Sequence, residues 1–532
     1  MPIFLSQQGE HPSPTRMPDA ASALEQIASA RKGDPLAPVT VIVPSHAAGL
    51  QMRRRLAEIT SFAGVRFETL PRIAELLGAG PLAADGRGPL ARPIGDYVAE
   101  QVARESRGRL GAIADLPGYA RALRKIFRRL RRGGIATGKE NVAASGTFLE
   151  ILRLYSLFRE RTAGFYDDDD LMDAATAAIR GGSPGALQDL GALYIVPPGP
   201  LTAAGVEMLG ALREAAPTYE ELDEPTGTPE MRFILAPDPA SEIREIVRDV
   251  VNALDAGCGI DQVAVFHGAD DSYPGLLREA FAAARIPTAP LPGIPLIETR
   301  AGRAVLMLAN LIEEEFARTA VMDFLSIAKL KETLPTAGSS IKPLTAVWDR
   351  ISRDAGISKG LDQWTSRLRA LARDRLAAAD RHESEGYEDR ANAAKLDEDQ
   401  AQTLQAVVEQ LARRLEPLSR PQPAAKFIEA FKTAIDDYID PSAEALDMVH
   451  DEIDQLGTVG AIGGEFSLAT FAEALDANLR VAHQRPASLG SGIFVGEHRI
   501  AAGLQFSHVS LCGAFEGALP AGPGADSLLD DS

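Results

Sequence analysis

Short β-branched runs, each followed closely by a helical pattern, constrain the fold of this 532-residue chain more than any other feature. The run VTVIV at 39–43 ends at Pro44-Ser45, and a helical pattern begins at about residue 47. Such strand–helix alternation with short turns is typical of parallel sheets that are covered by helices. The sequence therefore predicts an α/β protein.

The other strand and helix signals form two groups, separated and interrupted by helical stretches. Further strands are predicted at 65–69, 194–196, 233–235, 263–266, 492–495 and 508–511, with helices from Pro71 and at 240–256 and 273–285. Residues 217–230 are polar and are predicted to be a linker. The stretches 89–145, which is rich in arginine, and about 300–455 are almost entirely helical. We predict two parallel-sheet lobes, each interrupted by a helical insertion.

These patterns give expected domain boundaries and expected places for functional residues. The first lobe is expected at 1–88 and 146–228 around an insertion at 89–145, and the second at 229–325 and 461–532 around an insertion at 326–460. Ligands of parallel α/β sheets bind at the carboxyl ends of strands. The corresponding segments are Pro44–Ala48, Thr69–Arg72, Pro197–Thr202, His267–Asp271 and the turn before Gly503.

Composition excludes several classes of protein. An apolar share of 45% with 24% charged residues excludes wholesale disorder and collagen-like repeats. No apolar run approaches the roughly 20 residues of a membrane helix, and two cysteines cannot form a disulfide framework. We predict a cytoplasmic protein without a membrane partner. The net charge of −19 argues against a surface that coats nucleic acid everywhere, but it allows a local basic groove.

Several segments together resemble superfamily-one helicases, most closely the AddB/RexB-like subunits of bacterial helicase–nuclease repair complexes. They are VTVIVPSHAAGLQMRRRLAE (39–58), GVRFETLPRIAELL (64–77), ASEIREIVRDVVNALDAGCGIDQVAVFHG (240–268) and GIFVGEHRIAAGLQFSHVSLCGAFEGALP (492–520). The resemblance implies two RecA-like lobes of superfamily-one helicase type and a role in DNA repair and recombination as part of an exodeoxyribonuclease complex. It implies DNA, as a duplex end or single strand, and an ATP-driven AddA-like helicase subunit as partners.

The residues that ATP hydrolysis requires are missing from the expected places. Nucleotide hydrolysis needs a GxxxxGK[ST] loop after a strand and a second acidic magnesium ligand. No such loop precedes Val39, and the near match at 133–140 ends in Glu140 where a hydroxyl should bind magnesium. Further departures from the family pattern are Pro197, Pro198, His267-Gly268, Glu497, Arg499, Ala502 and Gln505. We predict an inactivated motor and assign no catalytic, nucleotide-binding or metal-binding residue.

The family's nuclease module also has no counterpart in this sequence. AddB-like chains continue into a PD-(D/E)XK nuclease that carries an iron–sulfur cluster, whereas this sequence ends at GADSLLDDS (524–532). We therefore expect the N-terminal portion of a longer protein with an unfinished second lobe. No cofactor is predicted in this chain, and the iron–sulfur cluster and Mg²⁺ are expected only in a missing C-terminal nuclease module.

Two groups of residues are candidates for DNA binding. The first lies at strand ends that face nucleic acid in helicases of this fold: Ser45, His46, Arg53, Thr69 and Arg72. Ser45 could instead cap a helix, and Arg53 could be helix C-terminal charge. The second is the polar face of an amphipathic helix: Arg124, Lys125, Arg128, Arg129 and Arg132, opposite Leu123, Ile126, Phe127 and Leu130. These cations could instead form a solvated face paired with acidic neighbours.

Other conspicuous residues have structural interpretations. Asp167–Asp170 is interpreted as carboxylates that complement a helix dipole, and Cys258 and Cys512 as buried, inert thiols. Trp348 and Trp364 are interpreted as core residues, with base stacking as the alternative.

Three hypotheses for the function remain open. The first is a DNA-binding scaffold in a double-strand-break-repair complex. The second is an active helicase that uses a phosphate loop at Lys139, and the third is a protein-interaction scaffold without a DNA role.

Overall fold

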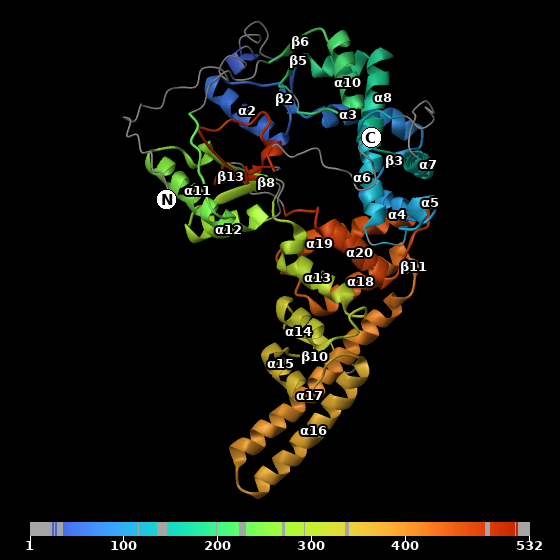
Figure 1. Cartoon of the computed structure of the whole chain (residues 1–532), viewed down its shortest axis with the longest axis vertical. Coiled ribbons are helices and arrows are strands. Elements are labelled where there is room, and N and C mark those ends of the chain that lie inside the picture. The colour runs from blue at the N-terminus through green and yellow to red at the C-terminus, as the bar shows by residue number, and fades with distance from the viewer. Residues whose placement is uncertain are drawn as a thin grey trace. The chain divides into compact units, whose positions relative to one another are not determined.

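The computed structural model describes most of the chain (Figure 1). The chain consists of two compact units. The described residues are 24–25, 27–28, 36–114, 116, 118–135, 146–182, 184–197, 199–222, 230–268, 272–291, 293–335, 340–484, 490–516 and 518–519. The α/β unit comprises Met1–Pro89, Lys125–Leu291 and Ala487–Ser532, and the helical unit comprises Leu90–Arg124 and Pro292–Pro486.

The first sheet of the α/β unit has four parallel strands in the order β2-β1-β5-β6. These are β1 (Val39–Ile42), β2 (Val65–Glu68), β5 (Ala192–Ile195) and β6 (Tyr219–Glu221). The associated helices are α2 (His46–Ile59), α3 (Leu70–Ala84), α8 (Asp168–Arg180), α9 (Pro184–Leu190) and α10 (Ala203–Ala215). Ile73, Leu193 and Met208 are fully buried in one core between the sheet and its helices. Burial on both faces explains why the strands β1 and β5 are mostly apolar.

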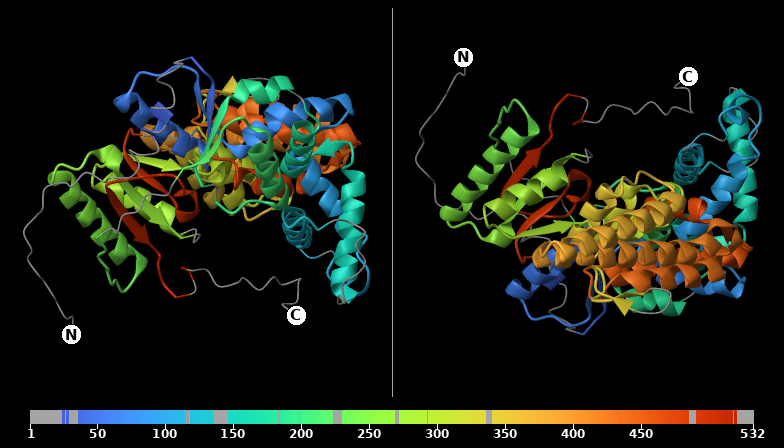
Figure 2. Two further views of the ribbon diagram at one scale, coloured as in Figure 1. Left: turned by 90° about the horizontal axis from the view of Figure 1, so that it is seen from above. Right: turned by 90° about the horizontal axis from the view of Figure 1, so that it is seen from below.

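The second sheet of the same unit is also four-stranded and parallel, in the order β14-β7-β13-β8. Its strands are β7 (Val263–His267), β8 (Thr288–Leu291), β13 (Ile493–Glu497) and β14 (His508–Cys512), with α11 (Pro239–Asp255) and α12 (Ser272–Ala283) beside them. Figure 2 shows the green and red strands of this sheet side by side, although they come from distant parts of the chain. The two sheets with their helical interruptions confirm the predicted fold class and agree with RecA-like lobes.

Two details of the strand prediction were wrong. Phe233–Leu235 forms no strand, and the side chains of Phe233 and Leu235 are 89% and 101% exposed. The predicted linker at 217–230 contains β6, whose Leu193↔Tyr219 register pairs it with β5. An apolar run thus lacks a partner strand among the described residues, whereas a polar run gains backbone hydrogen bonds from its neighbour.

The remaining elements are mostly helices. The α/β unit also contains α7 (Gly146–Arg161), and α6 (Tyr119–Arg132) contributes residues to both units. The helical unit contains α4 (Arg92–Ala103), α5 (Gly108–Gly111), α13 (Arg300–Asn310), α14 (Arg318–Ile327), α15 (Thr345–Asp354), α16 (Leu361–Ser384), α17 (Glu388–Leu415), α18 (Ala424–Tyr438), α19 (Leu446–Gly457) and α20 (Leu468–Leu479). The structure also has two-residue strands: β3 (Gly88–Pro89), β4 (Phe165–Tyr166), β9 (Leu334–Pro335), β10 (Ser340–Ile341), β11 (Gln422–Pro423) and β12 (Glu465–Phe466). The short 3₁₀ helices are η1 (Ile260–Gln262), η2 (Leu296–Glu298), η3 (Glu416–Ser419), η4 (Thr458–Ile462) and η5 (His498–Ile500).

Both tryptophans lie in the core of the helical unit, as predicted. Trp348 and Trp364 are fully buried. The Trp348 indole Nε1 donates to Gln400 Oε1 at 3.0 Å, and that of Trp364 donates to the Phe316 carbonyl at 2.7 Å. A buried indole needs a hydrogen-bond partner, and both have one. Neither ring is therefore available to stack on a base.

The two cysteines differ in their surroundings. Cys512 is buried, and burial raises the pKa of its thiol to about 12. Cys258 is only partly buried, and burial followed by the charge of Asp261 raises the pKa of its thiol. The prediction of a buried thiol is confirmed for Cys512 but not for Cys258.

A search of the described helices found none that is both long enough and apolar enough to cross a membrane.

Candidate nucleic-acid interface

The carboxyl ends of β1 and β2 bring the first group of predicted DNA contacts to one edge of the first sheet. Ile42 and Glu68 are register partners, and the Val43 N–H donates to the Glu68 carbonyl at 2.9 Å. Since three residues separate β1 from α2 and only Thr69 separates β2 from α3, both helix N-termini lie at this edge. Their backbone N–H groups and dipoles favour an anion there. The predicted neighbours Ser45, His46, Thr69 and Arg72 are thus brought together.

Their side chains are not equally available to a ligand. Ser45 Oγ accepts from the Ala48 N–H at 3.1 Å, so the alternative interpretation as a helix cap is confirmed. Thr69 has the N-cap position of α3, but its hydroxyl makes no capping hydrogen bond. Arg72 is exposed and donates to Glu75 at 2.6 Å, and this bond with its charge raises the pKa of Arg72. His46 is exposed at the first position of α2.

Arg53 lies in the middle of α2, because that helix continues to Ile59. The interpretation of Arg53 as C-terminal helix charge was therefore wrong, and its side chain is exposed. Two residues to either side of Arg53, Gln51 and Arg55 contact the loop before β14. Gln51 Nε2 donates to the Gln505 carbonyl at 2.6 Å, and the Gln505 N–H donates back to Gln51 Oε1 at 2.8 Å.

Arg55 completes this contact between the two lobes of the α/β unit. Its guanidinium donates to the Gln505 carbonyl at 3.2 Å and also to the Gln505 side chain. Burial lowers the pKa of Arg55, against an opposing effect of Glu58. Gln505 thus joins α2 to the second lobe. Sequence reasoning missed this contact, since a separation of 454 residues leaves no local signal.

The second group of predicted contacts lies on α6, whose apolar side packs as the spacing predicted. Leu123, Ile126 and Leu130 are buried. The Phe127 ring lies 5.2 Å from that of Phe158 on α7, centroid to centroid. The opposite side of α6 must therefore face solvent or a partner.

Some α6 cations are paired with carboxylates. The Arg124 Nε lies 3.5 Å from Asp96 Oδ1. Arg131 Nη2 lies 2.9 Å from both Asp170 Oδ1 and Asp173 Oδ2. Burial alone would lower the pKa of Arg131, but the charge of Asp167 and the bond to Asp173 raise it. For Arg124 the alternative of pairing with acidic neighbours is confirmed.

Arg131 belongs to an arginine–aspartate network at the start of α8, which consists of Arg87, Arg131, Arg159, Asp167, Asp170 and Asp173. Asp170 is only 8% exposed and also receives Arg87 and Arg159 at 2.9 Å. Burial would raise the pKa of Asp170, but the bonds from Arg159 and the Asp167 N–H lower it. Burial and the charge of Asp170 raise the pKa of Asp167.

Asp167 and Asp170 also form a capping box, in which each side chain accepts from the other's backbone N–H. This confirms the interpretation of Asp167–Asp170 as helix-start carboxylates. The network therefore explains the acidic run as a structural feature of α8.

Four exposed cations on one side of the helix form the outward face of α6, which consists of Lys125, Arg128, Arg129 and Arg132. All four side chains are exposed. Their spacing of three, four and seven residues places them on one side of a helix. No carboxylate of α6 shares that side, because Tyr119–Arg132 contains none. This face can attract phosphates without rearrangement of the helix.

The polar side chains at the strand ends of the second sheet make contacts within the protein. His267 Nδ1 donates to the Gly268 carbonyl at 2.7 Å, and His498 Nδ1 donates to the His267 carbonyl at 3.2 Å. Arg499 pairs with Glu497 at 3.2 Å. In the first sheet, Pro197 lies two residues beyond β5. Pro198, residues 269–271 and the near match's residues 136–140, with Lys139, lie outside the described residues.

Comparison with known families gives a match for the helical unit. Residues 298–483 match the sequence model described as RecBCD enzyme subunit RecC fourth domain. The matched segment contains α13 to α20. It supports a relationship of this segment to helicase–nuclease complexes of the RecBCD/AddAB type. A search of curated proteins gave no match.

Proposed function

We propose that this chain is a DNA-contacting subunit of a RecBCD-type helicase–nuclease complex in DNA repair, in which a partner subunit supplies the ATP-driven motor. The observation that carries the proposal is the match of residues 298–483 to the fourth domain of RecC. The two parallel sheets of the α/β unit support it, because superfamily-one helicases have two RecA-like lobes. The finer assignment to the AddB type rests on the resemblance of the sequence segments alone.

The chemistry of the described strand ends supports a silent motor. The β1–α2 turn contains only Val43, Pro44 and Ser45, which offer no lysine for phosphates. The side chain of Pro197 can neither bind magnesium nor polarise a water. At the strand ends that the structure describes, the residues therefore do not fit a magnesium nucleotide, and we assign none there.

The outward face of α6 and the edge at Ser45, His46, Thr69 and Arg72 are the proposed DNA contacts. A basic helix face neutralises phosphates and releases condensed counterions, which makes binding sensitive to salt. The helix N-termini of α2 and α3 at this edge are a further proposed place for a phosphate of the same backbone.

The test uses the full chain with a labelled duplex that has a single-stranded tail, and measures anisotropy over a potassium chloride series. We expect the variant Arg128→Glu/Arg132→Glu to bind DNA at least about tenfold more weakly. Its salt slope, which is the steepness with which log affinity falls as log salt concentration rises, should be smaller by about two. The matched control is Arg369→Glu/Arg373→Glu, which makes the same change in net charge on α16 and should leave binding within about twofold.

Two outcomes would contradict the proposal. Equal loss in both double variants would indicate a general charge effect and no contact at α6. DNA-stimulated ATP hydrolysis by the chain alone would contradict the silent motor and favour the active-helicase hypothesis.

A further inference from the structure

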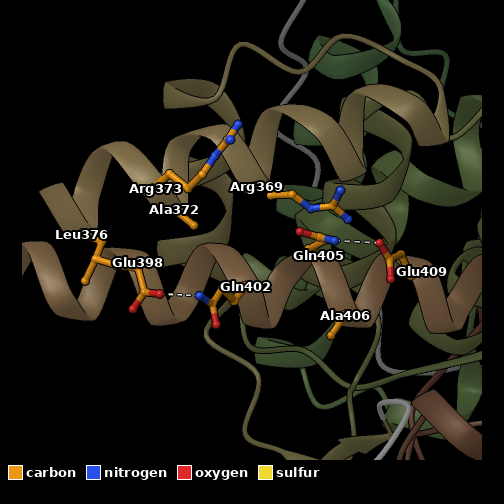
Figure 3. A pocket seen from close by; sticks show the side chains of 9 residues that line it. All are labelled: Arg369, Ala372, Arg373, Leu376, Glu398, Gln402, Gln405, Ala406 and Glu409. Carbon is orange, nitrogen blue, oxygen red and sulfur yellow. Dashed lines mark hydrogen bonds between the residues drawn. The ribbon is translucent and has the colours of Figure 1, made fainter.

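The helical unit contains a surface groove between two long helices. Helices α16 and α17 run side by side as an antiparallel pair (Figure 1). The hairpin groove, with a volume of about 350 Å³, is lined by Arg369, Ala372, Arg373 and Leu376 of α16 and by Glu398, Gln402, Gln405, Ala406 and Glu409 of α17 (Figure 3). Every lining residue belongs to one of these two helices.

The third helix that packs on this pair uses other residues. Trp348 of α15 donates to Gln400 of α17, and Arg350 Nη2 lies 2.6 Å from Asp397 Oδ1. Arg375 of α16 reaches Asp354 at 2.9 Å. None of these residues lines the groove. The α16–α17 pair thus has one side occupied by α15 and the groove on a different side.

The shape of the groove fits an α-helix. Its α16 residues recur at i, i+3, i+4 and i+7, and its α17 residues span Glu398 to Glu409, which is about 16 Å at 1.5 Å per residue. Ala372, at 5% exposure, and the half-buried Ala406 form a low floor between longer side chains. Two neighbouring helices with small residues between their ridges accept the side chains of a third helix.

The two walls of the groove carry opposite charges. Arg369 and Arg373 are exposed on the α16 wall, and no ion pair joins them to the α17 wall in the part of the chain that the structure describes. On the α17 wall, Glu409 accepts from Gln405 at 2.8 Å, and Glu398 accepts from Gln402. These amides orient the carboxylates and leave their charge in place.

We propose that the hairpin groove binds an amphipathic α-helix of a different polypeptide chain, with an apolar stripe over Ala372, Leu376 and Ala406. One edge of that helix is acidic toward Arg369 and Arg373, and the other is basic toward Glu398 and Glu409. DNA does not suit this groove, because the acidic wall repels phosphates. A second copy of the chain does not suit it either, because two chains of net charge −19 repel each other. The inference stands independently of the proposed DNA role.

The test uses the full chain and two synthetic helical peptides of about three heptads with the same alanine–leucine stripe. The mixed peptide has glutamates on one edge and lysines on the other, and the basic peptide has lysines on both. We expect the wild type to prefer the mixed peptide. Arg369→Glu/Arg373→Glu makes both walls acidic, so it should weaken the mixed peptide by about tenfold and strengthen the basic peptide.

The matched control is Arg128→Glu/Arg132→Glu, which should change neither peptide's affinity by more than about twofold. Similar changes in both double variants, equal binding of the two peptides, or no binding of the mixed peptide at about 1 mM would overturn the proposal. A labelled tailed duplex that competes for the groove would also overturn it. Since the DNA titrations use the same two variants in opposite roles, failure of one proposal is distinguishable from failure of the other.

Discussion

The outward face of α6 and the hairpin groove both contain exposed arginines. They differ in the charge of the other residues that line each surface. Lys125, Arg128 and Arg132 share their side of α6 with no carboxylate of that helix. Arg369 and Arg373 face a wall that contains Glu398 and Glu409. A surface of one sign suits a polyanion, whereas two walls of opposite sign suit a polypeptide that carries both charges.

A third arrangement occurs on α6 itself, where Arg131 belongs to the arginine–aspartate network. Its side chain is 20% exposed and contacts three carboxylates. Cations that are adjacent in sequence thus have different roles, because a rotation of 100° per residue turns one toward α8 and the next toward solvent. The number of arginines in a helix therefore does not predict its binding surface.

The largest expected effect concerns the arginine–aspartate network. Asp170→Asn should lower the free energy of unfolding by about 3 kcal/mol, because three guanidiniums lose a nearly buried carboxylate. Urea denaturation measures it. The control Asp168→Asn changes an exposed residue of the same helical turn, and it should cost less than about 0.5 kcal/mol. Equal costs would show that the network does not stabilise the unit.

The next effect compares how salt acts on the two surfaces. Raising potassium chloride from about 50 to 200 mM should weaken DNA binding on the order of a hundredfold, if about four phosphates are contacted. The same change should weaken the mixed peptide only a few-fold, because a short peptide releases no condensed counterions. Anisotropy titrations of both ligands provide the comparison, and parallel salt slopes would remove the distinction between the surfaces.

Replacing single cations by alanine tests which residues of α6 contact DNA. Lys125→Ala, Arg128→Ala and Arg132→Ala should each lower the DNA salt slope by about one. Arg72→Ala should lower it less, since Glu75 already neutralises part of that charge. The salt slopes of binding to the tailed duplex, measured for each variant, test this order of effects. A larger effect at Arg72 than at Arg128 would place the main contact at the sheet edge.

The smallest effect concerns the charges that hold α15 to the hairpin. A hydrogen bond from Arg350, together with the charges of Arg350 and Arg375, lowers the pKa of Asp397 against the opposing effect of its burial. A lowered pKa in the folded state stabilises the protein above the unfolded-state pKa, and this contribution disappears as pH falls through the lower value.

Asp397→Asn should therefore cost less than about 1 kcal/mol at pH 7, since Arg350 is half exposed. The difference from wild type should vanish in acid. Urea denaturation at pH 7 and below the lowered pKa of Asp397 measures both values, with exposed Asp374→Asn as the control. A cost that grows in acid would contradict this sign.

Local patterns predicted the elements whose own residues require burial. VTVIV became β1, the apolar stripe of α6 was confirmed, and Trp348 proved to be core. The sequence pattern failed where formation of a strand depends on a neighbouring strand. Tyr219–Glu221 is polar but pairs with β5, whereas Phe233–Leu235 is apolar and remains exposed. A strand is stabilised by hydrogen bonds to another strand, and no short window of sequence contains that partner.

The candidate site was predictable in the same uneven way. The sequence identified the α6 cations and the strand-end residues, since helical periodicity and the rule for parallel sheets are local or topological. It did not separate Arg124 from Arg128, because Asp96 belongs to a different helix. The hairpin groove was not predicted at all, since its two walls belong to different helices.

The sequence by itself determined the α/β class, the parallel sheets, the helical insertions and the amphipathic character of α6, since burial of apolar residues at fixed spacing is encoded within each segment. Only the tertiary structure decided which charges remain available. Gln505 meets Gln51, three arginines meet Asp170, and the walls of the groove face each other through contacts between distant segments. The physical reason is that the strength of an electrostatic interaction depends on distance and burial in space, which residue order does not specify.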